Sequence, residues 1–282
     1  MIARLGLRII ALGYLALVVL GPVVLLVVRT FAHGLEPVVA ALTSPDAVHA
    51  LQVTLVLVAM AVPVNTVFGV ICAFVLVRYR PPGTRLIAAL VDLPFAISPV
   101  VLGLALFTLY GRTGWLGPTL AEHGIDVVFA LPGMVLATVF VSLPFVVDEV
   151  APVLEEAGLE AEQAAATLGA SGWQTLWRIT LPAIRWGVTY GVVLTTARAL
   201  GEFGAVAIVS GNLVGETQTL PLFVEERFTD FDLTGAYAAG LLLGLIAVAV
   251  LIVLTRLSRR LDRRDRDGRD REPDRPPAVE VS

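Results

Sequence analysis

The chain contains no lysine, and all 20 of its basic residues are arginine. A P-loop ATPase binds the nucleotide phosphates through the lysine of its Gly-Lys-Ser/Thr motif. A chain without lysine cannot supply that group, so we do not expect it to hydrolyse ATP. We therefore predict that the chain is not an enzyme by itself and binds no cofactor of its own.

Cysteine and histidine are also scarce. Cys72 is the single cysteine, which excludes an intrachain disulfide and a cysteine-rich metal site. The three histidines, His33, His49 and His123, stand at no metal-ligand spacing. The apolar runs hold no Ser/His set and no His-Glu-x-x-His motif, so the sequence does not support an intramembrane hydrolase. We predict no metal site and no catalytic residue.

Charged residues are few for a soluble protein. They make up 16% of the chain, against 57% hydrophobic residues and a mean hydropathy of +0.84, whereas soluble domains are about half apolar and a quarter charged. Apolar runs of about 20 residues, long enough to cross a bilayer as helix, recur along the chain. The sequence predicts an all-α, polytopic membrane protein packed in membrane lipid, with no nucleic-acid partner. Its six transmembrane helices are expected at about 9–28, 49–77, 86–110, 131–150, 188–210 and 236–257.

The arginines are distributed unevenly between the two ends of these spans. With the N-terminus inside, sixteen arginines lie in cytoplasmic segments and three in outer loops. An excess of arginine marks the cytoplasmic side of a membrane protein. We therefore expect a multi-pass protein of the bacterial cytoplasmic (inner) membrane, with both termini in the cytoplasm.

The sequence divides into three parts. Residues 1–48 hold the first membrane helix and an outer loop, and residues 49–257 hold the other five spans. Residues 258–282 are rich in arginine and aspartate and contain three prolines; such a segment buries no core, so we expect a disordered cytoplasmic tail. In the third span, Pro94 and Pro99 stand on either side of Ser98. Two prolines so close predict a break, and broken backbone at membrane depth lines a path or faces other helices.

A polar segment between the fourth and fifth spans has a regular spacing. Its alanines favour a helix, and Gly169 suits the left-handed residue that ends one. We predict that a second helix follows the turn. The segment reads Glu162-Gln163-Ala164-Ala165-Ala166-Thr167-Leu168-Gly169, then nine residues, then Ile179-Thr180-Leu181-Pro182.

The second helix has its own start and stop signals. Ser171 and Gln174 have the spacing of a capping box. Trp173 and Trp177 are one helical turn apart and share a face. Pro182 makes the preceding residue extended in most contexts, so we expect it to end this helix.

This segment resembles the EAA loop in the membrane subunits of bacterial ATP-binding-cassette importers, the type I permeases. The resemblance implies that the loop at about 151–187 couples the chain to a separate ATPase, a homodimer that uses ATP and Mg²⁺. The family pattern begins with Glu; that position is Gln163 here, and Glu162 stands one residue earlier, so the role of the acid stays open. The residues implied in coupling are Glu162, Gln163, Ala164, Ala165, Leu168, Gly169, Trp173, Trp177, Ile179, Leu181 and Pro182.

A second distinctive stretch runs from Arg198 to Leu222. It is similar to the sulfate, thiosulfate and molybdate permeases, and the Phe223-Val224-Glu225 that follows favours the W-type subunit of sulfate importers. The similarity implies a heterodimer with a second sulfate permease subunit and a periplasmic or extracellular sulfate/thiosulfate-binding protein. A molybdate or tungstate importer, with one permease forming a homodimer, is the alternative. An ion-coupled transporter would predict an inverted repeat, and the sequence shows none.

Arg198 and Glu202 are charged residues within the fifth span. Arg198 lies about ten residues into the span, or roughly 15 Å deep, and Glu202 is one turn further on the same face. Either Arg198 attracts an anion in transit while Glu202 limits how tightly it binds, or the two form a structural ion pair. The candidate path comprises Arg198, Gly201, Glu202, Gly204, Pro94, Ser98 and Pro99.

Overall fold

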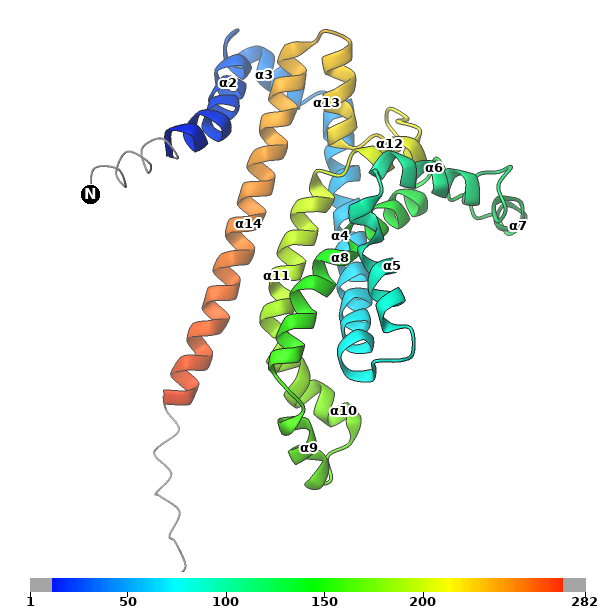
Figure 1. Cartoon of the computed structure of the whole chain (residues 1–282). Helices are drawn as coiled ribbons and strands as arrows, with labels where there is room; N and C mark the ends of the chain where they lie inside the picture. The colour runs from blue at the N-terminus through cyan, green and yellow to red at the C-terminus, as the bar shows by residue number, and fades with distance from the viewer. Residues whose placement is uncertain (1–11, 271–282) are drawn as a thin grey trace, which may run out of the picture.

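The computed structural model of the chain describes residues 12–270, with side chains described as far as Arg256. Within this range all regular structure is helical, as the sequence predicts. Figure 1 shows the elements by label. They are η1 (Ala16–Leu20), α2 (Gly21–Thr30), α3 (Leu35–Leu42), α4 (Pro45–Phe74), η2 (Val75–Tyr79), α5 (Thr84–Ala96), α6 (Pro99–Tyr110), α7 (Gly117–Glu122), α8 (Leu131–Glu156), α9 (Glu160–Thr167), α10 (Gly172–Thr175), η3 (Leu176–Thr180), α11 (Leu181–Leu200), α12 (Gly204–Ser210), α13 (Leu220–Thr229) and α14 (Leu233–Asp270), where η marks a π-helical segment.

Helices α4, α8 and α11 form the centre of the molecule (Figure 1). In the most apolar 18-residue stretch of each long helix, the share of buried residues is 50% for α8, 28% for α4 with η2, 11% for α14 and 0% for the N-terminal helix at 12–30. The buried side chains that join the three central helices are Ala73, Val77, Val146, Val150, Leu154 and Ile184. The outer helices leave leucines and valines exposed, as expected for a surface that faces lipid.

Glycines allow the central helices to approach closely. A Cβ atom on Gly69 would lie 2.5 Å from the Cβ of Val146, and one on Gly191 would lie 2.9 Å from the Cα of the same valine. One turn before Gly191, a Cβ on Gly187 would lie 2.4 Å from the carbonyl oxygen of Glu149. Gly187 and Gly191 form a Gly-x-x-x-Gly pattern, which brings membrane helices into close contact. This spacing is a signal present in the sequence, and the predictions above did not draw on it.

The predicted number of spans is confirmed with a qualification. Four helices are long and apolar enough to cross a membrane without interruption, and two further spans are each a bent pair of helices. The pair α5 and α6 bends by 111°, and the pair of the run 172–200 with α12 bends by 57°. We predicted a break in the third span, whereas the break in the fifth span, expected at about 188–210, was not predicted.

Each break has a local cause. Pro94 lies in the last turn of α5 and Pro99 opens α6, with the two linking residues in extended backbone. In the fifth span, α11 ends at Leu200, and the carboxylate of Glu202 accepts a hydrogen bond from the backbone N–H of Ala205 at 3.1 Å. Glu202, which precedes the N-cap residue Phe203, therefore satisfies one backbone donor in the first turn of α12, and its negative charge favours a helix start there.

The two ends of the chain lie partly outside this description. The predicted first span begins at residue 9, and residues 9–11 are outside the described residues. Helix α14 continues past residue 258 to Asp270. The disorder expected from residue 258 is therefore not found at 258–270. Residues 271–282 lie outside the described residues, so disorder there stays a prediction.

Candidate functional site

The segment from Glu162 to Pro182, here called the coupling segment, projects with α9 and α10 from one end of the molecule (Figure 1). Helix α9 ends as predicted: Gly169 adopts φ +84°, in the left-handed region. The N–H of Ala170 donates to the carbonyl of Ala165, and that of Gly169 to the carbonyl of Ala166, both at 3.0 Å. These two bonds form a Schellman motif, which fixes the reversal of the chain.

The second helix of the coupling segment begins as predicted. The Ser171 hydroxyl accepts a hydrogen bond from the N–H of Gln174 at 3.3 Å, and the Gln174 side chain accepts one from the N–H of Ser171 at 2.9 Å. The capping box is therefore complete. It satisfies two backbone donors at the helix start.

The tip of the coupling segment exposes large apolar side chains. The Trp173 and Trp177 rings pack edge to face with centroids 5.6 Å apart. These two residues are 68% and 56% exposed, and Leu168 is 88% exposed. Large exposed apolar side chains mark a surface for a partner. Ala164 is also exposed, whereas Ala165 packs inward.

The predicted end of the second helix at Pro182 is wrong. Leu181 is helical, with φ −61° and ψ −43°, and the helix runs from Gly172 through Ile179 to Leu200. The π-helical segment η3 explains the difference, because the N–H of Leu181 bonds to the carbonyl of Leu176, five residues back. Pro182 then falls in the first turn of α11, where proline is tolerated.

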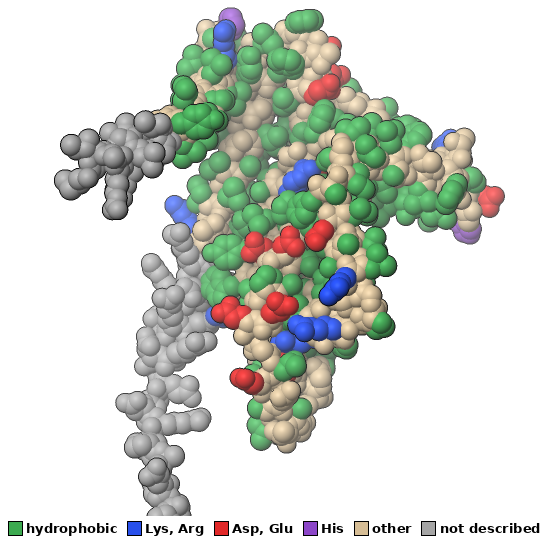
Figure 2. Space-filling model, viewed as in Figure 1, with side chains coloured by type: hydrophobic (Ala, Val, Ile, Leu, Met, Phe, Trp, Pro, Cys, Tyr) green, Lys and Arg blue, Asp and Glu red, His purple; other side chains and the backbone are tan. Residues whose placement is uncertain are grey.

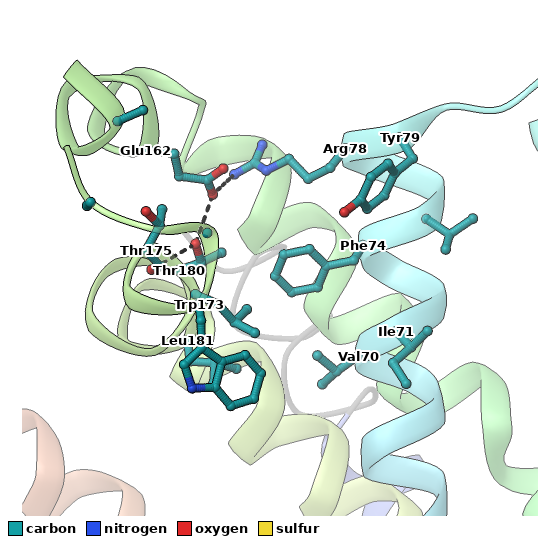
Figure 3. Close-up of a pocket in the computed structure, with 15 residues that line it drawn as sticks. Val70, Ile71, Phe74, Arg78, Tyr79, Glu162, Trp173, Thr175, Thr180 and Leu181 are labelled. Carbon is teal, nitrogen blue, oxygen red and sulfur yellow. Dashed lines mark hydrogen bonds and ion pairs between the residues drawn. The ribbon is translucent and has the colours of Figure 1, made fainter. Parts of the chain in front are cut away.

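Glu162 and Gln163 point in different directions. One oxygen of the Glu162 carboxylate accepts hydrogen bonds from the Arg78 guanidinium at 3.2 Å and from the Thr180 hydroxyl at 3.1 Å (Figure 3). Gln163 is exposed. Glu162 therefore faces the molecule and Gln163 faces outward, and the role of the acid in coupling stays a prediction.

Arg78 is a site residue that the sequence analysis missed. Besides Glu162, its guanidinium donates to the carbonyl of Gly158 at 2.6 Å. It was counted only among the cytoplasmic arginines, because its partners lie 80 and 84 residues along the chain. No short-range pattern reports such a contact.

The second candidate site lies at the break in the fifth span. Arg198 and Glu202 form an ion pair with an N–O distance of 2.6 Å. The Glu202 side chain is 0% exposed, and that of Arg198 is 30% exposed. The acid is thus held inside the molecule, while part of the Arg198 side chain remains accessible. A Cβ on Gly201, between them, would come no closer than 3.9 Å to the carbonyl oxygen of Ala197.

The two helix breaks lie against each other. A Cβ on Gly204, the first residue of α12, would lie 3.0 Å from the Cβ of Pro99, the first residue of α6. A Cβ on Gly103 would lie 2.9 Å from the carbonyl oxygen of Ala205. The structure therefore brings Pro99 and Gly204 together beside the Arg198–Glu202 pair. Pro94 lies before the same break, and Ser98 is exposed within it.

Charged side chains are unevenly distributed over the face of the molecule drawn in Figure 2. Figure 2 shows most acidic and basic side chains over its lower part, toward the end with α9 and α10, and hydrophobic side chains over much of the rest. Among the described residues, no group of three or more His, Cys, Asp or Glu side chains is placed to hold a metal ion.

Comparison with known proteins gives a consistent result. A family model described as "Binding-protein-dependent transport system inner membrane component" matches residues 65–266. The chain is 52% identical over 244 residues to the sulfate transport system permease protein CysW of Synechococcus elongatus, covering 86% of this chain and 85% of that protein. It is 47% identical to CysW of Escherichia coli K12, covering 86% and 83%, and 43% identical to the permease protein CysT of Synechococcus elongatus, covering 86% and 88%.

Solved structures share the fold. A bacterial alginate ABC transporter in complex with an alginate pentasaccharide-bound periplasmic protein contains a chain that matches with a TM-score of 0.79 at 17% identity. The match covers 92% of this chain and 94% of that one. At this identity the likeness concerns the arrangement of the helices alone.

Proposed function

This chain belongs to the binding-protein-dependent transport system inner membrane components, and from that premise we propose that it is the permease subunit of an ATP-driven sulfate importer. The observation that carries the proposal is the 47–52% identity, over 86% of the chain, to sulfate permeases of the CysW type. Identity to a CysT protein is lower, at 43%. These relatives do not favour the molybdate or tungstate alternative. Transport of thiosulfate as well as sulfate is part of the proposal.

The proposed complex contains further subunits. This chain pairs with a second, CysT-like permease, and a homodimeric ATPase binds the exposed tip of the coupling segment. A separate ATPase is required because this chain has no P-loop lysine, and that subunit uses ATP and Mg²⁺. A sulfate-binding protein docks at the opposite end of the molecule. The solved complex of the alginate transporter with a periplasmic protein supports this arrangement by fold alone.

ATP is needed because the cargo is a dianion. Moving two negative charges inward against an inside-negative potential costs about 4.6 kcal/mol per 100 mV, at about 2.3 kcal/mol per charge. In the proposed mechanism the accessible side of Arg198 attracts the anion, and Glu202 holds the guanidinium in place. Because Glu202 offsets part of the positive charge, the anion is held weakly enough to leave.

The experiment that tests this function is ATPase stimulation in the reconstituted complex. This chain is co-expressed with its candidate ATPase and second permease, placed in liposomes with the binding protein, and supplied separately with sulfate, thiosulfate or molybdate. We expect stimulation by sulfate only when both permeases are present. Stimulation by molybdate with this chain as the single permease would contradict the proposal and support the molybdate alternative.

A further inference from the structure

Glu162 ties three parts of the chain together. Through Arg78 it contacts η2, which directly continues helix α4, and through Thr180 it contacts η3, which directly precedes α11. Arg78 also binds the carbonyl of Gly158 in the turn between α8 and α9. We call Arg78, Glu162 and Thr180 the latch. The ion pair is largely shielded, with 11% of the Arg78 side chain and 22% of the Glu162 side chain exposed.

Both membrane-helix partners in the latch lie in π-helical segments. Arg78 lies in η2, and Thr180 is the last residue of η3. A π-helical turn widens the helix and interrupts its regular bonding, and such turns are frequent at functional sites. The latch thus joins the coupling segment to the two central helices where each departs from regular α-helical geometry.

A cavity lies beside the latch. A cavity of about 700 Å³ opens between α4 with η2 on one side and the coupling segment on the other (Figure 3). Its walls are mostly apolar and include Val70, Phe74, Trp173 and Leu181. Arg78 and Glu162 lie in the same lining, so their ion pair bridges two walls that the cavity otherwise separates.

We propose that Glu162 is a positioning residue that ties α9 to η2 and α4 through Arg78 and to the 172–200 helix through Thr180, so that movement of the coupling segment reaches α4 and α11 together. The inference rests on the proposed function, since the movement originates in the ATPase. With the latch closed, α9 moves as one body with the ends of both central helices. With the latch broken, the cavity gives the coupling segment room to move without α4, and ATP is hydrolysed without transport.

The test uses the complete complex in liposomes with Glu162→Gln. The quantity measured is sulfate transported per ATP hydrolysed, because a role in assembly alone lowers both rates and leaves this ratio unchanged. We expect the ratio to fall about tenfold, within the range of coupling between protein sites, while sulfate still stimulates ATP hydrolysis. Glu156→Gln is the matched control: it removes the same charge at an exposed position near the end of α8, and its ratio should equal that of the wild type.

Two further variants separate the latch from general damage. Arg78→Glu combined with Glu162→Arg restores an ion pair with reversed charges and should recover most of the ratio lost in either single variant. Thr180→Val keeps the side-chain shape, removes one of the two hydrogen bonds and should lower the ratio by less than Glu162→Gln. A wild-type ratio in Glu162→Gln, or a reversed pair no better than the single variants, would overturn the inference. If the wild-type complex shows no sulfate-stimulated hydrolysis, the proposed function itself fails.

Discussion

Arg198 and Glu202 depend on each other because the acid is fully buried. Arg198→Ala would leave a buried carboxylate without its ion partner, which costs about 3–5 kcal/mol. We therefore expect the variant to lower the thermal unfolding temperature of the assembled complex and to abolish sulfate uptake. Thermal unfolding in detergent and uptake into liposomes measure the two effects.

A second variant distinguishes stability from transport at this pair. Arg198→Met with Glu202→Gln removes both charges, and the Gln side chain can still accept the hydrogen bond from Ala205. Most of the lost stability should return, because no buried charge is left unpaired. Uptake should remain lost, because no cation faces the anion. Normal uptake in this double variant would show that the pair is structural and has no part in the path.

At the residue scale, sequence separation decides which contacts were predictable. The Arg198–Glu202 pair follows from helical spacing, since residues four apart share a face. The capping box of Ser171 and Gln174 follows from a similar short-range rule. Arg78 and Glu162 are 84 residues apart, and their contact depends on how α4, α8 and α9 are arranged in space. A single sequence contains no local signal for that arrangement.

The coupling segment depends, as an element, on the turn at Gly169. Proline has φ fixed near −65°, whereas Gly169 adopts +84° and its N–H donates to Ala166. Gly169→Pro should therefore destroy the Schellman motif and displace the second helix. We expect the protein to insert in the membrane at normal levels and ATP-driven sulfate uptake to be lost. Membrane fractionation and an uptake assay test the two parts.

Asparagine provides the control for this turn. It tolerates the left-handed region better than other non-glycine residues, so Gly169→Asn should keep most of the uptake. Wild-type uptake in Gly169→Pro would show that the turn does not matter for coupling. A Cβ atom added to Gly169 would meet no atom of the described residues within 4 Å. Backbone geometry is therefore the cause of any difference between the two variants.

Start and stop signals were reliable for α9 and α10 but failed at Pro182. The Schellman motif and the capping box are made within a few residues, so the local sequence predicts them. Proline usually ends or kinks a helix because of its missing N–H and its clash with the preceding turn. In this chain the hydrogen bonding shifts to a five-residue spacing in η3, and Pro182 falls in the first turn of α11, where proline is tolerated. A π-helical turn has no sequence signature that we could use.

At the scale of the whole molecule, orientation in the membrane is the main prediction still to be tested. We expect the end with α9 and α10 in the cytoplasm, because arginine is concentrated there and in the tail. In a Cys72→Ala background, single cysteines replace Ala121 in α7 and Pro82 in the turn between η2 and α5; both positions are exposed. A membrane-impermeant maleimide should label Ala121→Cys in intact spheroplasts and Pro82→Cys only after lysis. The reverse pattern would contradict the orientation.

The number of membrane spans could be predicted from the sequence, but only one of the two bends in those spans could. Apolar run length gave the six spans, since a bilayer sets the length of a crossing helix. The 111° bend between α5 and α6 was signalled by Pro94 and Pro99. The 57° bend after Leu200 has no proline to signal it. At this bend the buried Glu202 side chain accepts a hydrogen bond from the N–H of Ala205. From the sequence alone, Glu202 fits a regular helical position.

The helix that failed to end at Pro182 has a mechanical consequence. From Gly172 to Leu200 it is unbroken and spans about 43 Å at 1.5 Å per residue. One end carries the exposed tryptophans and the other adjoins the Arg198–Glu202 pair. A tilt of this helix by about 10° would carry one end roughly 7 Å relative to the other over that length. In the proposed mechanism, force applied at the tryptophans would therefore reach the Arg198–Glu202 pair through one continuous helix, with no loop between them.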